Sequence, residues 1–344
     1  MSAEKFKIAL TRDVLGADGA TVFDPAALEL LKSDPAVAWE ILPDYADEIS
    51  AELAARYDGL VLLKPRLTAA SLARPDRRLK VVARFGVGYD TVDVEACTRA
   101  GVVLTITPDG VRRPVATIIL TFILALAQKL FAKDRITRAG RWQERTAFMG
   151  DGLTGKTVGS IGFGNIGRET FRLLQPLDMV HLACDPAPDH DEADRLAVRL
   201  VDLDTLLATA DFVSVSCPLS PQTRHLIGAR ELGLMKPSAF LINTARGPIV
   251  DEAALTSALV DRRIAGAALD VFDQEPTPPD NPILTLDNVI VTPHSLCWTD
   301  EAFRNMARDA FRSLLDIAHG RVPKHVVNRA VLAHPDLAVL SPTH

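Results

Sequence analysis

Short apolar runs alternate with amphipathic stretches along the first hundred residues of the chain. A short run bounded by polar or turn residues is typical of a buried strand, whereas apolar residues three or four positions apart indicate a helix. The predicted strands are 6–10, 37–42, 59–63, 79–85 and 102–107, and the predicted helices between them are 25–33, 46–57 and 92–100. Strands and helices in regular turn predict parallel β/α units, with helices packed on the faces of one sheet.

A second alternating series begins at Lys156. Its predicted strands are 156–161, 179–184, 212–217, 239–245, 265–272 and 288–293, and its predicted helices are 165–175, 202–210 and 251–263. The chain then closes with a long amphipathic helix over 299–320. Thr299 is the expected N-cap of this helix, and two acids follow in its first turn. The fold class is therefore α/β, with two doubly wound parallel-sheet domains.

One strongly apolar helix is predicted between the two series, over residues 114–133. Its longest apolar run, Val115 to Ala127, is shorter than the roughly 20 residues that a membrane-spanning helix needs. We therefore expect a helix buried on most sides, at a domain or subunit interface. A polar stretch, "RAGRWQERTAFMGDGLTGK", follows it.

Composition and charge narrow the class of protein. The chain has 344 residues, 48% hydrophobic and 24% charged, as in an ordinary globular protein of two domains. Its net charge of −6 disfavours a nucleic-acid partner, because contacts to phosphates need a basic surface. The N-terminus, "MSAEKFKIAL", enters a strand directly and lacks the apolar region of a signal peptide, so no membrane partner is expected.

The four cysteines, Cys97, Cys184, Cys217 and Cys297, lie far apart and have neither CxxC nor Cys/His spacing. We therefore expect no metal site. Cysteines of this kind, in a chain without a signal peptide, fit a reducing compartment, and the expected location is the cytoplasm.

The stretch "IGFGNIG", residues 161–167, is the clearest candidate for a binding site. A predicted strand precedes it and a predicted helix follows it, as a dinucleotide-binding loop requires. In such a loop Gly162 permits the tight turn, Gly164 lets the backbone approach a pyrophosphate, and Gly167 allows close packing of helix on strand. The free N–H groups of the helix N-terminus then face the phosphates.

An acid at the end of the next strand supports this interpretation. Asp185 follows Gly162 by 23 residues (185 − 162). A carboxylate there accepts hydrogen bonds from an adenosine ribose and repels a 2′-phosphate, so NAD is favoured over NADP. The alternative is a structural glycine turn beside a surface aspartate that binds nothing.

Other strand ends of the second series carry reactive residues. Cys217-Pro218, Arg246 of "NTARG", the acids of "LDVFDQEP" and His294 of "TPHS" all follow predicted strands. Ligands of open α/β sheets bind beyond the carboxyl ends of the strands. An arginine offers a fixed fork for a carboxylate, and a histidine can give or take the proton of an alcohol or ketone. These residues indicate chemistry on a small hydroxy or keto acid.

Six stretches in one order give the chain a specific resemblance. They are "RFGVGYDTVD", "GLTGKTVGSIGFGNIG", "CPLSPQTRHLI", "LMKPSAFLINTARGPIVDEAAL", "GAALDVFDQEP" and "NVIVTPHS". The chain resembles the NAD-dependent D-2-hydroxyacid dehydrogenases, the family that includes phosphoglycerate, glycerate/hydroxypyruvate and D-lactate dehydrogenases. The similarity runs from about residue 55 to residue 330.

The resemblance implies how the domains are arranged. A Rossmann NAD-binding domain, 109–298, would be inserted in a flavodoxin-like substrate domain made of 1–108 and 299–344. It also implies a homodimer whose substrate is a small 2-hydroxy or 2-keto acid.

The resemblance further implies roles for single residues. Arg246 would bind the substrate carboxylate, His294 would be the general acid/base, and Glu275 would hydrogen-bond His294. Asp273, two residues from Glu275, is the alternative partner. The backbone N–H groups of Val87 and Gly88 would also bind the substrate. The implied cofactor contacts are Gly162, Gly164, Asn165, Ile166, Gly167, Asp185, Cys217, Pro218, Thr223, Thr244, Ala245, Asp270 and His294.

Several residues remain open between a functional and a structural role. Lys64 follows a strand end and is a candidate for binding the substrate. The alternative is that it is a solvated charged residue of a loop. Arg112 and Arg113 replace residues that are usually neutral in the family, and we expect them to flank a helix start. Trp298 would be either a pocket wall near His294 or a packing residue, and Thr117 stands where many members have an acid.

These motifs do not identify the substrate acid. Glyoxylate, hydroxypyruvate, phosphohydroxypyruvate and larger keto acids are all candidate substrates. An NAD-sensing protein-interaction module, like the co-repressors built on this fold, is the alternative function. Oxidation of formate or phosphite is a third possibility, which the "TPHS" stretch does little to support.

Overall fold

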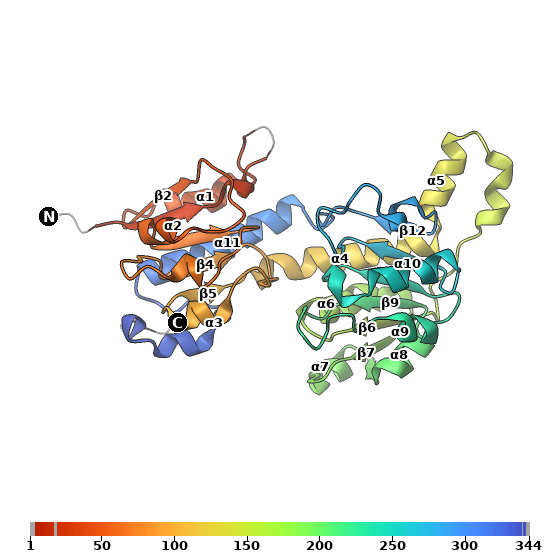
Figure 1. Cartoon of the computed structure of the whole chain (residues 1–344). Coiled ribbons are helices and arrows are strands. Elements are labelled where there is room, and N and C mark those ends of the chain that lie inside the picture. The colour runs from red at the N-terminus through yellow and green to blue at the C-terminus, as the bar shows by residue number, and fades with distance from the viewer. Residues whose placement is uncertain (1–3, 17–18, 339, 342–344) are drawn as a thin grey trace. The chain divides into compact units, whose positions relative to one another are not determined.

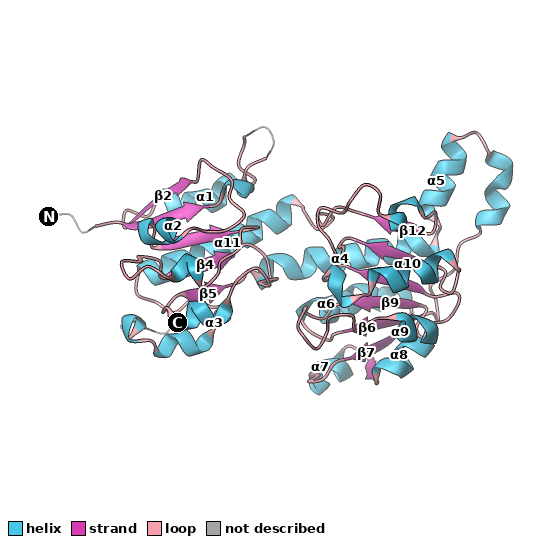
Figure 2. Ribbon diagram, in the orientation of Figure 1, coloured by secondary structure: helices cyan, strands magenta, loops and turns pink. Residues whose placement is uncertain are grey.

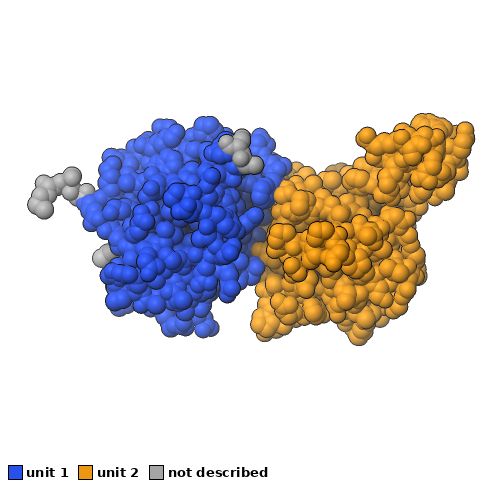
Figure 3. All heavy atoms as spheres, turned by 45° about the horizontal axis from the view of Figure 1, so that its top comes forward, with its two compact units in different colours: residues 1–111, 298–344 blue, residues 112–297 orange. Residues whose placement is uncertain are grey.

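The computed structural model describes residues 4–16, 19–338 and 340–341, and Figure 1 traces the chain. The chain forms two compact units, which Figure 3 distinguishes by colour. Unit 1 comprises Met1–Val111 and Trp298–His344, and unit 2 comprises Arg112–Cys297. The expected domain boundaries, at 108/109 and 298/299, lie close to the boundaries of these units.

Unit 1 contains a five-stranded parallel sheet (Figure 2). Its strands are β1 (Phe6–Leu10), β2 (Val37–Ile41), β3 (Gly59–Leu62), β4 (Val81–Arg84) and β5 (Val103–Thr105). They lie in the order β2-β1-β3-β4-β5, the flavodoxin-like order. The strands are almost continuously apolar because helices cover both faces of the sheet.

The helices of unit 1 are α1 (Pro25–Lys32), α2 (Ala51–Arg56), α3 (Val94–Arg99) and α11 (Asp300–Ala318). Helix α11 packs on α1, β3 and β4, so it and α1 form one helical layer on the same face of the sheet. The Oγ1 atom of Thr299 accepts the N–H of Ala302, as an N-cap does. Helices α2 and α3 pack on the opposite face through Ala54, Ala96 and Cys97.

Unit 2 contains a seven-stranded parallel sheet in the order β12-β11-β10-β9-β6-β7-β8. These strands are β6 (Thr157–Ile161), β7 (Val180–Cys184), β8 (Val198–Leu200), β9 (Phe212–Val215), β10 (Phe240–Asn243), β11 (Gly266–Leu269) and β12 (Val289–Val291). Strand order reverses beside β6, as in the Rossmann fold. Both sheets therefore confirm the predicted α/β class.

The helices of unit 2 lie on both faces of its sheet. They are α6 (Asn165–Leu174), α7 (His190–Arg195), α8 (Leu203–Thr209), α9 (Ala229–Leu234) and α10 (Glu252–Val260). Leu182 of β7 belongs to the core that α8, α9 and α10 cover. The ring of its neighbour His181 lies 5.0 Å from that of Phe171 in α6. Since successive strand residues point to opposite faces, α6 covers the other side.

One expectation about secondary structure was wrong, and one strand was not predicted. The apolar helix is two helices, α4 (Pro108–Ala127) and α5 (Leu130–Arg138), separated by Lys129 in a left-handed conformation with φ of 51°. The helix begins at Pro108, a favourable first position, and its polar first turn hides this start in the hydropathy pattern. Strand β8 was not predicted, because a three-residue edge strand carries almost no periodic signal.

Helix α4 is long and apolar enough to cross a membrane by length and composition alone. However, 67% of its most apolar window is buried inside the protein. Its composition is therefore that of a helix packed in a protein core.

Candidate active site

The glycine loop after β6 has the geometry that a pyrophosphate-binding turn requires. Gly162 adopts a φ of +105°, which favours glycine, and a Cβ atom there would lie 2.7 Å from the carbonyl oxygen of Ser216. A Cβ atom on Gly167 would lie 2.5 Å from the oxygen of Gly162, so this glycine lets α6 pack against the turn. Gly164 faces open space, and it precedes Asn165 and Ile166 in the first turn of α6. The residues present fit a dinucleotide.

Asp185 closes the side of this loop. One of its carboxylate oxygens accepts the N–H of Phe163 at 2.7 Å, and the other accepts the N–H of Ala187 at 2.9 Å. A carboxylate has about four acceptor positions, so two remain for the hydroxyls of a ribose. Asp185 therefore shapes the loop and can also select its ligand.

Two further strand ends of unit 2 carry expected cofactor contacts. After β9, Thr223 donates its hydroxyl to the carbonyl oxygen of Pro218 at 2.6 Å and closes the loop that begins at Cys217. Burial raises the pKa of Cys217 to about 11, so its thiol is neutral near pH 7 and forms a small apolar wall. Thr244 and Ala245 follow β10, and both are half-buried.

The turn that carries Arg246 is held by a residue that we did not single out from the sequence. Asn243 is 1% exposed, accepts the N–H of Ala245 at 3.0 Å and donates to the carbonyl oxygen of Arg246 at 2.9 Å. The Nη1 atom of Arg246 donates to the carbonyl oxygen of Ala245 at 2.7 Å. A polar residue ending an apolar strand was the only local signal of this role.

Gly247 explains how Arg246 approaches the segment that follows β11. A Cβ atom on Gly247 would lie 1.9 Å from the carbonyl carbon of Phe272, so only glycine permits the two backbones to meet. The loop that starts there is braced by Glu252, which accepts the N–H of Asp273 at 3.0 Å and the amide of Asn281 at 2.7 Å.

The structure contains the hydrogen bond expected between Glu275 and His294. The Oε2 atom of Glu275 lies 2.6 Å from Nδ1 of His294, while Oε1 accepts the N–H of Phe272 at 3.0 Å. Partial burial is the largest single influence and raises the pKa of Glu275, but the hydrogen bond and charge of His294, together with the N–H of Phe272, hold the pKa below its usual value. The positive charge of Arg246 lowers the pKa of Glu275 further, so the charges of Arg246, Glu275 and His294 interact with one another.

His294 itself has a positive φ of 53°, which is uncommon for a residue with a side chain. Asp270 holds the loop in this conformation. Its Oδ1 atom accepts the hydroxyl of Thr292 at 2.6 Å and the N–H groups of Ser295 and Leu296 at 3.2 and 3.3 Å. Asp270, which is 2% exposed, thus orients the histidine loop, a role beyond its expected contact with the cofactor.

The expected substrate contacts of unit 1 lie in loops after two strands. Val87 and Gly88 follow β4, and within the described part of the chain their N–H groups have no acceptor. Both groups are therefore available to a ligand carboxylate. Lys64 follows β3, and its backbone N–H donates to Oδ2 of Asp13 at 2.6 Å.

Arg112 and Arg113 do not flank a helix start, because α4 already begins at Pro108. The Nη1 atom of Arg113 donates to Oε1 of Glu169 at 2.7 Å, and Nε of Arg112 lies 3.9 Å from Oε2. Burial raises the pKa of Glu169, but the hydrogen bonds from Arg113 and Arg172 lower it below its usual value. The two arginines therefore tie α4 to α6 within unit 2. The hydroxyl of Thr117 donates to the carbonyl oxygen of Arg113 in the same helix at 2.9 Å.

A dinucleotide-binding loop with an acid at the next strand end makes unit 2 a nicotinamide-type Rossmann domain. The family model described as "D-isomer specific 2-hydroxyacid dehydrogenase, NAD binding domain" matches residues 120–295. The chain belongs to this family, and its cofactor is NAD.

Named relatives agree with this assignment. The chain is 40% identical to a glyoxylate reductase of Thermofilum pendens over 278 residues, which cover 79% of this chain and 81% of that protein. It is 38% identical to a D-3-phosphoglycerate dehydrogenase of Archaeoglobus fulgidus over 287 residues, which cover 83% of this chain. That match spans only about half of the dehydrogenase, 54% of its length.

Solved structures share the fold. The crystal structure of a glyoxylate reductase from Paecilomyes thermophila matches with a TM-score of 0.81 and 27% identity. The match covers 94% of this chain and 98% of that one.

Proposed function

We propose that the protein is an NAD-dependent oxidoreductase that interconverts a D-2-hydroxy acid and its 2-keto acid. The observation that carries the proposal is the Glu275–His294 hydrogen bond of 2.6 Å, with Arg246 acting on the same carboxylate. A general acid/base beside a fixed cation suits a substrate that carries a carbonyl next to a carboxylate. The family supports the same reaction class.

In reduction, the guanidinium of Arg246 binds the substrate carboxylate and orients the adjacent carbonyl. His294 then gives a proton to the carbonyl oxygen as it becomes an alcohol, and in oxidation it takes that proton back. Glu275 holds Nδ1 of His294, which leaves Nε2 for the substrate. We also propose that the N–H groups of Val87 and Gly88 bind the substrate.

NAD supplies or accepts the hydride at its nicotinamide ring. We propose that the turn at Gly162, Gly164 and Gly167 binds its pyrophosphate and that Asp185 binds the adenosine ribose. Cys217, Thr244 and Ala245 would line the nicotinamide side. The carboxylate of Asp185 would repel a 2′-phosphate, which favours NAD over NADP.

The named relatives reduce glyoxylate or act on 3-phosphoglycerate, and we propose a small 2-keto acid of this kind as the substrate. The direct test is loss of NADH absorbance on addition of a panel of 2-keto acids. His294→Gln should abolish most turnover and keep NADH binding. An NADH-binding protein that reduces none of the acids would contradict the proposal and favour the protein-interaction module.

We also propose a homodimer of the cytoplasm. Five large apolar side chains near the end of α4, on α5 and on the segment 142–149 are 39–76% exposed: Leu124, Leu130, Phe131, Trp142 and Met149. Apolar side chains gathered on adjoining segments support a protein interface, and a second copy of the chain is the partner proposed. Light scattering should give twice the chain mass, and Phe131→Glu should lower it to a monomer.

A further inference from the structure

The first turn of α4 belongs to unit 1 and lies against α11. A Cβ atom on Gly110 would clash with the backbone nitrogen of Met306, so only glycine lets the two helices approach this closely. Asp109 precedes this glycine, and Asp309 follows Met306 by three residues on α11. The approach of the helices therefore brings two carboxylates together. Burial and the charge of Asp109 raise the pKa of Asp309, as expected for two neighbouring acids.

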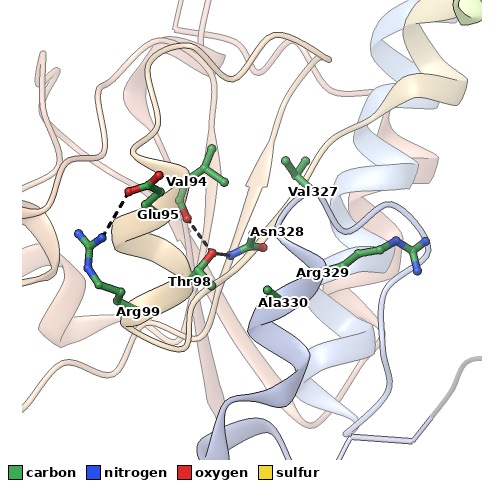
Figure 4. A pocket seen from close by; sticks show the side chains of 8 residues that line it. All are labelled: Val94, Glu95, Thr98, Arg99, Val327, Asn328, Arg329 and Ala330. Carbon is green, nitrogen blue, oxygen red and sulfur yellow. Dashed lines mark hydrogen bonds and ion pairs between the residues drawn. The ribbon is translucent and has the colours of Figure 1, made fainter. Parts of the chain in front are cut away.

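A histidine joins the two acids from the segment that follows α11. The Nε2 atom of His325 lies 3.1 Å from Oδ2 of Asp109. Three residues further on, the side chain of Asn328 fixes this segment on the rest of unit 1. It donates to Oγ1 of Thr98 at 3.2 Å, as Figure 4 shows, and accepts the N–H of Leu104 in β5 at 2.9 Å. The backbone that carries the histidine is therefore held in place by the fold.

Three possible metal ligands converge at this place. One carboxylate oxygen of Asp109, one of Asp309 and a ring nitrogen of His325 all lie within 4.8 Å of one another. Bonds of about 2.0–2.2 Å to a tetrahedral Zn²⁺ put the ligand atoms about 3.3 Å apart. The 3.1 Å between His325 and Asp109 is already close to this spacing. The side chain of Asp109 is 42% exposed, so a water molecule can take the fourth position.

One oxygen of the group lacks a partner. The Oδ2 atom of Asp309 is buried, and none of the residues that the structure describes gives it a hydrogen bond. A buried charged acceptor without a partner destabilises the folded state. A cation bound by Asp309 and Asp109 would supply that partner and would also remove the repulsion between the two carboxylates.

Lys324 would compete with such a cation. Its Nζ atom lies 2.7 Å from Oδ2 of Asp109. The lysine side chain is 75% exposed and can turn into solvent, and an exposed ion pair of this kind contributes little to stability. An ion held by three ligands would therefore displace Lys324.

We propose that Asp109, Asp309 and His325 bind a divalent transition metal, with Zn²⁺ as the preferred ion. One imidazole with two carboxylates suits Zn²⁺, whereas Mg²⁺ and Ca²⁺ prefer oxygen ligands. The ion joins the first turn of α4, the middle of α11 and the segment after α11, so its role is to stabilise unit 1. No metal site was expected from the sequence, because the three ligands lie in separate parts of the chain.

The test measures zinc binding to the whole protein. The protein is first freed of metal with a chelator, and Zn²⁺ is then titrated by calorimetry at pH 7. We expect a saturable site and a Tm that rises with the zinc concentration, because a ligand that binds only the folded state stabilises it. Mg²⁺ at the same concentrations should change Tm little. The zinc affinity should fall as the pH is lowered, since ligands lose protons when they bind a metal.

Substitutions then locate the ion. Asp309→Asn and His325→Gln should each weaken zinc binding by about tenfold or more, the loss that follows when even an indirect partner of a metal is changed. Lys324→Met should tighten binding by about threefold, because it removes a competing ion pair. His319→Gln is the matched control. His319 also pairs with an aspartate, Asp34 at 2.6 Å, but belongs to no group of three such ligands in the described part of the chain.

The outcomes are decisive for the site. A Tm that zinc leaves unchanged, or a zinc affinity that Asp309→Asn and His325→Gln do not lower, overturns the assignment. An affinity lowered as much by His319→Gln also overturns it, because zinc would then bind adventitiously at histidines of the surface. Weaker binding to Lys324→Met would contradict a site at Asp109. The Glu275–His294 pair lies in unit 2, so the metal site and the proposed function are tested separately.

Discussion

Glu275→Gln tests the coupling of the acid/base pair most sharply. The wild-type carboxylate accepts the N–H of Phe272 with Oε1 and meets Nδ1 of His294 with Oε2. A glutamine that keeps the first bond turns its NH2 group toward Nδ1. Two donors then face each other whenever the imidazole is protonated, so the variant disfavours the imidazolium that reduction requires.

The size of the effect follows from the geometry. Opposite charges about 4 Å apart interact by about 4 kcal/mol at an effective dielectric constant of about 20. The side chains of His294 and Glu275 are 41% and 36% exposed, so solvent screens the pair and about 1–2 kcal/mol remains. About 1.4 kcal/mol is a factor of ten in population.

The assay is the pH dependence of kcat/KM in both directions. For Glu275→Gln we expect reduction at pH 7 to fall by about tenfold and its profile to move toward acid. Oxidation, which needs a neutral His294 with a free Nε2, should fall as well, because an NH2 group that faces Nδ1 favours the tautomer with its proton on Nε2. Asp273→Asn is the matched control, because the contact of Asp273 with the site that the structure describes is made by its backbone N–H, which donates to Glu252. Superimposable profiles for Glu275→Gln and the wild type would refute the reasoning, as would a shift produced by Asp273→Asn alone.

Three further substitutions probe other parts of the account. Arg246→Lys should lower kcat/KM for the keto acid at least tenfold, about 1.4 kcal/mol, while the NADH affinity, measured by fluorescence, stays near the wild-type value. If the variant instead loses NADH affinity and keeps its KM for the keto acid, Arg246 belongs to the cofactor site. Asp185→Asn keeps one acceptor oxygen for the loop and removes the charge, so it should reduce the preference for NADH over NADPH, chiefly through KM. Equal kcat/KM values for the two cofactors in the wild type would contradict the role of Asp185 in selecting NAD. Burial and Asp109 raise the pKa of Asp309 above 3.8, so its charge destabilises the folded state at neutral pH. Asp309→Asn should therefore raise Tm at pH 7 and match wild type below pH 3.8, and a lower Tm at pH 7 would count against this explanation.

The sequence predicted those parts of the fold and site that depend on local pattern. Buried parallel strands are continuously apolar, so both sheets could be recognised from the sequence. The spacing of the glycines at 162, 164 and 167 is itself the signal of a dinucleotide-binding loop. The break at Lys129 could not, because no glycine or proline marks the left-handed residue. Hydropathy likewise cannot show that Pro108 begins a helix whose first turn is polar.

Contacts between distant segments carried no local signal. Glu252 braces the loop before Glu275 through hydrogen bonds to Asp273 and Asn281, which only the folded chain brings close to it. The same holds for the proposed metal site of unit 1, where Asp109, Asp309 and His325 come from three separate parts of the sequence. Resemblance to a family supplied the roles of Arg246, Glu275 and His294, and the geometry added the residues that hold them in place.

The central claim, that the chain oxidises and reduces one enantiomer of a 2-hydroxy acid, is tested most directly by product formation from separate enantiomers. NAD and the enzyme are mixed with the D or the L form of glycerate and of lactate, and NADH is followed by its absorbance. We expect NADH from a D enantiomer, none from the matching L enantiomer, and none from either with His294→Gln. Equal formation of NADH from both enantiomers would contradict this claim. Absence of NADH formation with both enantiomers of glycerate and of lactate would contradict it as well.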